Sequence, residues 1–176
     1  MNYQELNSML SKFDDISFPE VKYVVKNPMY ANLLYDNLSG EFGELSAVTQ
    51  YVYEHMDMIE NLELSSIMLK IAIQEMRHLN LVGELIKRLG KTPCFINSKG
   101  QNWNSSFLNY NIENIVKTME HNIKTEKIAI DGYNKAIRYT RNQDIRKLFS
   151  RIILDEKNHI EVFTRIIENV QKINDK

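Results

Sequence analysis

The sequence has little of several residue types, and each shortage excludes a class of structure. Its 176 residues contain one cysteine, Cys94, so an intrachain disulfide is excluded, as are zinc and rubredoxin-type iron sites that need several thiols. Six glycines and three prolines are few for this length, which disfavours an all-β fold with many tight turns. No run approaches the roughly 18 apolar residues of a membrane-spanning helix. The first 15 residues also lack the apolar stretch of a signal peptide. We therefore expect a cytoplasmic protein with no membrane partner.

The charge is balanced rather than of one sign. The 22 basic and 23 acidic residues give a formal net charge of −1, so there is no electrostatic case for a nucleic-acid partner. Hydrophobic residues make up 43% of the chain and charged residues 26%, as in ordinary globular proteins. The length suits one domain with a substantial core.

The spacing of apolar residues predicts four long helices, at about 28–58, 62–89, 111–140 and 142–172. Asn27-Pro28 is typical of a helix start, and Gly40 and Gly43 weaken the middle of the first helix. Residues 1–27 are interpreted as a lead-in with a short helix near 2–12, residues 28–172 as the bundle and 173–176 as a tail. The first and third connections are short, whereas the second, at 91–109, is long and polar. This predicts an all-α fold, an antiparallel four-helix bundle with a long crossover between its second and third helices.

Two polar pairs interrupt apolar seams in this pattern. A seam read at spacings of three and four residues is apolar in the second and fourth predicted helices, except for Glu75 with His78 and Glu156 with His159. A buried ionised carboxylate is costly unless it is paired or bound to a metal. One Glu-x-x-His pair alone is a weak signal, since such a pair is more often a buried ion pair or a satisfied core histidine than a metal ligand.

A second repeat strengthens the signal. The first predicted helix carries Glu44-x-x-Ala-x-x-x-Tyr51, and the third carries Glu126-x-x-Ala-x-x-x-Tyr133. Glu44 precedes Glu75 by 31 residues and Glu126 precedes Glu156 by 30, so the two halves repeat one hairpin. One Glu from each of two helices and Glu-x-x-His from the other two is the pattern of dinuclear iron or manganese carboxylate sites. We therefore expect two metal ions per chain, iron or manganese, with these ligands: Glu44, Glu75, His78, Glu126, Glu156 and His159.

Four further residues are candidates to surround the ligands. Tyr51 and Tyr133 are either core aromatics or hydrogen-bond donors to a ligand carboxylate. Gln74 and Asp155 immediately precede ligand glutamates and either orient a ligand histidine or face solvent. In a crossed bundle each would serve the opposite hairpin, so Asp155 would support His78 and Gln74 would support His159. A carboxylate raises imidazole basicity more than an amide does, and this predicts the tighter metal at His78.

Over about residues 28–170 the chain resembles the ferritin-like superfamily. The stretches "NPMYANLLYDNLSGEFGELSAVTQY" and "QEMRHLNLVGELIKRLG" resemble manganese catalases and their short spore-coat relatives, whereas "EKIAIDGYNKAI" and "LDEKNHIEVF" are similar to rubrerythrins and bacterioferritins. The resemblance implies a ferritin-like bundle and the six ligands above. In manganese catalases the residue matching Glu156 is better described as a proton carrier near the metals than as a firm ligand. The chain departs from these families at Ala129, where rubrerythrins have an extra Glu, and at Thr125, where manganese catalases often carry a basic residue.

Three functions remain open from the sequence. The first is an oxidoreductase acting on peroxide or O2, of catalase or peroxidase type, with Glu156 as the catalytic residue. The second is an iron-binding ferroxidase acting on Fe(II), and the third is a structural bundle with a vestigial site. No haem is expected. Leu, Tyr and Met residues around 29–38, taken as exposed, suggest a homodimer or a higher homo-oligomer.

Overall fold

The structure is a computed structural model that describes residues 2–111 and 114–174. Within these residues the regular secondary structure is helical, apart from one isolated antiparallel bridge between Ile96 and Asn102. In chain order the elements are α1 (Tyr3–Leu10), the 3-10 turn η1 (Ser11–Phe13), α2 (Pro28–Ser39), α3 (Glu44–Asp57), α4 (Leu62–Arg88), η2 (Ser105–Phe107), α5 (Ile115–Arg138) and α6 (Gln143–Asn174).

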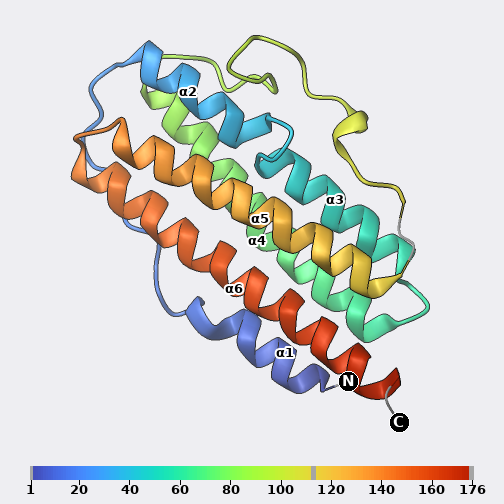
Figure 1. The fold of residues 1–176 in the computed structure, drawn as a ribbon. Helices are drawn as coiled ribbons and strands as arrows, with labels where there is room; N and C mark the ends of the chain where they lie inside the picture. The colour runs from blue at the N-terminus through green and yellow to red at the C-terminus, as the bar shows by residue number, and fades with distance from the viewer. Residues whose placement is uncertain (1, 112–113, 175–176) are drawn as a thin grey trace.

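The long helices form a bundle of two hairpins (Figure 1). One hairpin pairs α3 with α4, the other pairs α5 with α6, and α2 packs on both α4 and α5. The long connection between α4 and α5 runs along α2 and α3, where it accepts hydrogen bonds from Tyr35 and Ser39. This confirms the predicted all-α bundle with a long crossover. Among the described residues, no helix is both long and apolar enough to cross a bilayer.

The first predicted helix, 28–58, is wrong as one element, because the chain breaks between α2 and α3. Gly40 ends α2 in an extended conformation and Gly43 stands before the first residue of α3. A Cβ atom at either glycine would lie 2.6 Å from the backbone oxygen of Asp36, so no larger residue fits without movement. The break places Glu44 in the first turn of α3.

Asparagine side chains begin the other long helices. Asn27, Asn61 and Asn114 each accept a hydrogen bond from the backbone N–H three residues ahead, and Asn142 does the same at the start of α6. The third helix was expected to begin at about residue 111 but begins at Ile115, and residues 112–113 of that expectation lie outside the described residues.

The core forms two apolar clusters with the polar pairs of the seams between them. Tyr30, Leu34, Tyr35 and Leu38 of α2 are buried in one cluster, and only Met29 is strongly exposed, at 85%. The expectation of an exposed apolar surface around 29–38 is therefore wrong, because α2 turns this face onto α4 and α5. The oligomeric state inferred from that surface stays a prediction without its original support.

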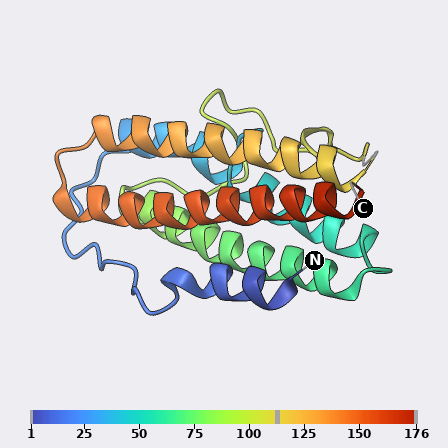
Figure 2. The same ribbon diagram turned by 60° about the horizontal axis from the view of Figure 1, so that its bottom comes forward.

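The N-terminal segment is packed against the bundle (Figure 2). The helix α1 contacts both α4 and α6, and Leu6 and Leu10 are buried in the second apolar cluster. Residues 1–27, interpreted from the sequence as a lead-in, thus include part of the core. Whether they form a unit separate from 28–172 stays a prediction.

Candidate metal centre

The six candidate ligands meet in one buried layer at the middle of the bundle. In the first half, Nδ1 of His78 lies 3.1 Å from Glu75, 3.2 Å from Glu156 and 3.7 Å from Glu44. Oxygen and nitrogen atoms of these four residues lie within 4.8 Å of one another. This spacing could hold a metal ion.

The second half repeats the arrangement. Nδ1 of His159 lies 2.8 Å from Glu75, 3.2 Å from Glu156 and 3.5 Å from Glu126. These four residues also place their ligand atoms within 4.8 Å of one another. Glu75 and Glu156 belong to both groups, so they are positioned to bridge two cations, while Glu44 and Glu126 stand at the outer ends.

The two tyrosines bond across the bundle to the outer carboxylates. The hydroxyl of Tyr133 donates to Oε1 of Glu44, and the hydroxyl of Tyr51 donates to Oε1 of Glu126. Both tyrosines are fully buried. The sequence left open whether each tyrosine is a core aromatic or a hydrogen-bond donor to a ligand carboxylate. In the structure each tyrosine is both, and its donor bond reaches the opposite hairpin.

The ring nitrogen that faces away from the glutamates, Nε2, also has a partner from the opposite hairpin in each histidine. Nε2 of His78 lies 3.1 Å from Oδ2 of Asp155, and Nε2 of His159 lies 3.0 Å from Oε1 of Gln74. These contacts have the crossed pairing expected from the sequence. They leave Nδ1 of both rings facing the four glutamates.

Several atoms of this layer are buried but have no partner in hydrogen-bonding geometry. They are Oε2 of Glu44, Oε1 of Glu75, both carboxylate oxygens of Glu156 and Nδ1 of His159. Buried polar atoms are rarely left in this state, and carboxylate and imidazole donors suit iron and manganese. Four carboxylates also match the charge of two divalent cations. The residues present therefore fit a dinuclear metal centre.

Without cations, protons must balance these charges. Burial raises the pKa of Glu44 well above its usual value, and the charges of Glu75 and Glu156 raise it further. The same causes raise the pKa of Glu126 to about 8. Burial opposes the charge on Glu75 too, but the two histidines hold its pKa well below the usual range.

The pKa values of both histidines are also raised. Burial disfavours their charged form, yet Glu75 and Glu156 raise the pKa of His78 and of His159 well above the ordinary value. The metal-free layer is thus a set of imidazolium–carboxylate contacts, and cations would replace those protons.

The sequence reasoning missed two buried charged residues near the centre. Glu54 of α3 is fully buried and accepts hydrogen bonds from Gln50 at 2.9 Å and Asn122 at 2.7 Å. Arg151 of α6 pairs with Asp155 at 2.6 Å. Glu54 lies four residues after Gln50, and Arg151 lies four residues before Asp155. Residues at this spacing are neighbours on a helix surface, so the spacing could have predicted both pairs from the sequence.

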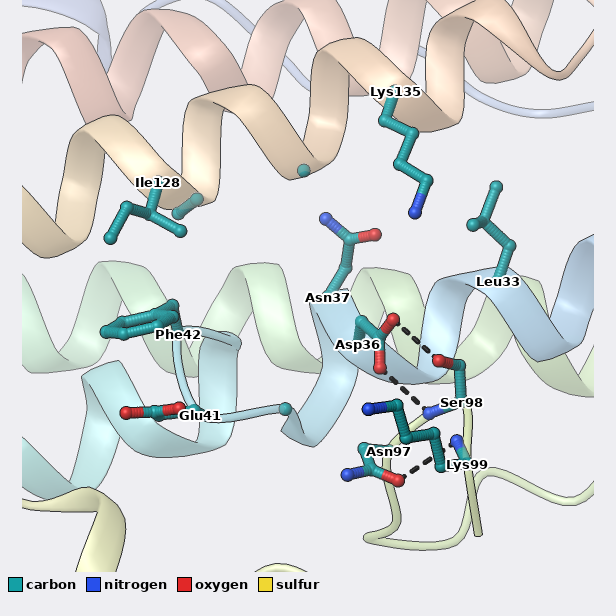
Figure 3. A pocket seen from close by; sticks show the side chains of 13 residues that line it. Leu33, Asp36, Asn37, Glu41, Phe42, Asn97, Ser98, Lys99, Ile128 and Lys135 are labelled. Atoms are coloured by element: carbon teal, nitrogen blue, oxygen red, sulfur yellow. Dashed lines mark hydrogen bonds between the residues drawn. The ribbon is translucent and has the colours of Figure 1, made fainter. Parts of the chain in front are cut away.

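A pocket of about 330 Å³ opens between the α2–α3 junction, α5 and the loop at residues 97–99. In Figure 3 the side chains of Asn37 and Lys135 point into it, while Phe42 and Ile128 face each other at one end. Asp36 holds the loop through two hydrogen bonds from Ser98, at 2.7 and 2.8 Å.

A much smaller pocket of about 30 Å³ shares Glu41, Phe42 and Ala129 with the large one and reaches Tyr51 and Glu126. We call it the neck. It brings the outer pocket close to one candidate ligand, and the small side chains of Ala47, Thr125 and Ala129 line it.

Comparisons with known proteins show similarity to two groups, manganese catalases and bacterioferritins. The family model described as "Manganese containing catalase" matches residues 18–95. A probable manganese catalase of Clostridium acetobutylicum is 25% identical over 173 residues, which cover 86% of this chain and 76% of the relative. The bacterioferritin of Desulfovibrio desulfuricans is 29% identical over 137 residues, covering 75% of this chain and 72% of the relative.

Solved structures give the same two groups. The manganese catalase KatB from Anabaena superimposes with a TM-score of 0.82 at 26% identity, covering 92% of this chain and 81% of that one. The bacterioferritin of Desulfovibrio desulfuricans, described with a diiron site, has a TM-score of 0.69 at 25% identity, with 86% and 88% covered.

Proposed function

Because this chain belongs to the ferritin-like superfamily of dinuclear carboxylate proteins, we propose that it is an oxidoreductase that decomposes hydrogen peroxide with a pair of manganese or iron ions. The observation that carries the proposal is the pair of overlapping ligand groups that share Glu75 and Glu156. The manganese catalase family model favours peroxide as the substrate, because its match includes Glu44, Glu75 and His78.

In this proposal each hairpin supplies the terminal ligands of one ion. Glu44 and His78 would hold the first, Glu126 and His159 the second, and Glu75 would contact both, while Glu156 would lie beside both ions and keep an oxygen for proton transfer. A bound pair of such ions would supply the two-electron redox chemistry by which two molecules of peroxide become O2 and two of water. The tyrosine donors each occupy Oε1 of an outer glutamate, and so leave its Oε2 for a cation.

Glu156 is the residue we assign to proton transfer. Both of its oxygens are buried without hydrogen-bond partners, and it lies 3.2 Å from Nδ1 of each histidine. A carboxylate in this position can take a proton from peroxide and return it to the leaving oxygen. Of the four glutamates it is the one that matches, by the resemblance stated above, the proton carrier of manganese catalases.

The neck is the proposed entry for peroxide. Of the pockets described above, it alone touches a candidate ligand, and its size suits a molecule of two heavy atoms. Departures from the related families also lie here, since Ala129 and Thr125 are smaller than the residues expected from rubrerythrins and manganese catalases.

Oxygen evolution from peroxide tests the proposal directly. Protein loaded separately with Mn(II) and Fe(II) should release one O2 for every two molecules of peroxide consumed. Glu156→Gln, which keeps the side-chain volume, should lower the rate by about 10²–10⁴-fold, the usual contribution of acid–base catalysis. A metal-loaded protein that is inactive with both ions would refute the peroxide function.

An iron-oxidising function is the second candidate. It is favoured by the likeness to bacterioferritin in sequence and structure. It predicts rapid oxidation of Fe(II) by O2, and storage would also require an assembly that holds many irons per chain. Size determination and iron stoichiometry after aerobic loading separate this candidate from the first. The expected homodimer or higher oligomer is checked in the same measurement.

A structural bundle with a vestigial site is the third candidate. It predicts that added metal leaves the unfolding temperature unchanged, and that Glu75→Ala stabilises the metal-free protein by removing a buried charge.

A further inference from the structure

The partner of His159 is held by the end of α1. Nε2 of Gln74 donates to the backbone oxygen of Leu10 at 3.3 Å, while Oε1 of the same amide lies 3.0 Å from Nε2 of His159. An amide NH2 group donates and cannot accept. The contact with Leu10 therefore fixes which end of the amide faces the ring, and it presents an acceptor to His159.

The partner of His78 is held by the residues just after α1. Arg151 donates to the backbone oxygens of Phe13 at 2.8 Å and Ile16 at 3.0 Å, and to Oδ1 of Asp155 at 2.6 Å. The other oxygen of Asp155 lies 3.1 Å from Nε2 of His78. Two hydrogen-bonded chains thus run from the N-terminal segment to the two candidate ligand histidines.

The backbone oxygens used here are available for a physical reason. The last carbonyls of a helix have no intrahelical partner and accept hydrogen bonds from side chains instead. Leu10 is the last residue of α1 and Phe13 the last of η1. The end of the N-terminal helix therefore presents carbonyl oxygens where α4 and α6 present Gln74 and Arg151, and the oxygen of Phe13 also accepts from the backbone N–H of Ile16 at 3.0 Å.

Both hydrogen-bonded chains have the same effect on the imidazole rings of His78 and His159. Each Nε2 faces an acceptor and so keeps its proton when a cation replaces the proton on Nδ1, and the Nδ1 lone pair then points toward the four glutamates. The segment also contacts one ring directly, since Phe18 lies edge-on to His78 with 5.8 Å between ring centroids.

We propose that residues 2–18 are a positioning element of the metal centre, which orients both ligand histidines through Gln74 and through Arg151 with Asp155. The proposal rests on the proposed function, because it requires that His78 and His159 bind metal. It predicts that loosening α1 weakens metal binding although no residue of α1 touches a ligand atom of the centre.

The matched variants are Leu6→Ala and Leu34→Ala. Both leucines are fully buried, but Leu6 anchors α1 in one apolar cluster and Leu34 belongs to α2 in the other. In full-length protein titrated with Mn(II), Leu6→Ala should lower the affinity by about 10-fold or more, the lower end of what outer partners of metal ligands contribute. Leu34→Ala should bind as the wild type does, at a temperature where both variants are folded.

Arg151→Met tests only the hydrogen-bonded chain that ends at His78, and the result does not depend on how well Leu6→Ala folds. It should weaken one of two Mn(II) binding steps by about 10–100-fold and leave the other near its wild-type value. Protein loaded with Zn(II) gives a second readout, the exchange of the Nε2 protons in NMR spectra. Exchange should accelerate at both rings in Leu6→Ala, mainly at His78 in Arg151→Met, and at neither in Leu34→Ala.

The outcomes separate the two proposals. If wild-type protein takes up no metal, both the proposed function and this inference are wrong. If the wild type binds two ions and Leu6→Ala and Arg151→Met retain its affinities, only the positioning role is wrong. Equal losses in Leu6→Ala and Leu34→Ala would likewise refute it, because they would trace to general destabilisation.

Discussion

At the scale of single residues, Glu54 carries the clearest pH dependence outside the metal centre. Burial raises its pKa to about 8, the hydrogen bonds from Asn122 and Gln50 oppose that rise, and Asp57 adds to it. An acid whose pKa is higher in the folded state binds more protons when folded. Stability therefore falls as the pH rises from the unfolded value near 4.5 towards 8, by roughly 4–5 kcal/mol for such a shift.

Glu54→Gln should remove this loss. Oδ1 of Asn122 is buried without a partner, so a turned Asn122 amide can accept from the new amide while Gln50 continues to donate. Urea unfolding of the metal-free protein at pH 5.5 and 7.5 measures the effect. The variant should lose less stability than the wild type between these values; parallel losses would show that Glu54 does not titrate in this range.

The partners of the two histidines predict unequal metal affinities. Asp155 supports His78 and Gln74 supports His159, and a carboxylate makes an imidazole a stronger ligand than an amide does. The ion at His78 should therefore bind more tightly. Asp155→Asn should narrow the gap between the two binding steps in a titration of the apo protein. Two equal steps in the wild type, unchanged by the substitution, would contradict this.

At the scale of helices, the break between α2 and α3 decides where Glu44 lies. A Cβ atom on Gly43 would approach the backbone oxygens of Asp36 at 2.6 Å and Asn37 at 2.7 Å, and backbone atoms cannot move aside cheaply. Gly43→Ala should destabilise the protein by about 1–3 kcal/mol and weaken metal binding at the Glu44 half.

Gly83→Ala is the control. Gly83 lies within α4, and a Cβ atom there would be 3.7 Å from its nearest neighbours, which is an ordinary van der Waals distance. It should be neutral or stabilise the protein by about 0.5–1 kcal/mol, as expected for Gly→Ala inside a helix. Thermal unfolding of both variants measures the difference, and similar behaviour of the two would contradict the steric argument.

The facing helices α3 and α5 also form the neck. Ala129→Leu adds volume to a pocket of about 30 Å³ and should close it. We expect a lower kcat/KM for peroxide with unchanged metal content. Ala129→Ser, which adds one atom, should behave as the wild type does. Full activity in the leucine variant would mean that peroxide enters elsewhere.

At the scale of the whole molecule, the centre joins both hairpins. Six buried ligand candidates come from α3, α4, α5 and α6, so ions bound there would hold all four helices together. Binding to the folded state alone stabilises it by about 2.7 kcal/mol when free metal is 100 times the dissociation constant. Calorimetry with Mn(II) and with a chelator should show a higher unfolding temperature in the metal-loaded protein, and no shift in Glu75→Ala.

The sequence by itself determined the long helices, apart from the break within 28–58, and the composition of the centre. Apolar spacing and asparagine caps are local signals, and the repeat of Glu44, Glu75 and His78 in Glu126, Glu156 and His159 is visible without coordinates. Burial of two Glu-x-x-His pairs in apolar seams was enough to predict that they would meet, because all the helices of a bundle turn their apolar seams to one core.

Only the tertiary structure decided what surrounds that centre. The break at Gly40 and Gly43 depends on contacts with Asp36, the burial of the face around 29–38 depends on α4 and α5, and the N-terminal segment reaches the histidines through backbone oxygens. Backbone acceptors leave no mark in a sequence, because every residue has one. Their partners are chosen by how separate helices pack, which local spacing does not encode.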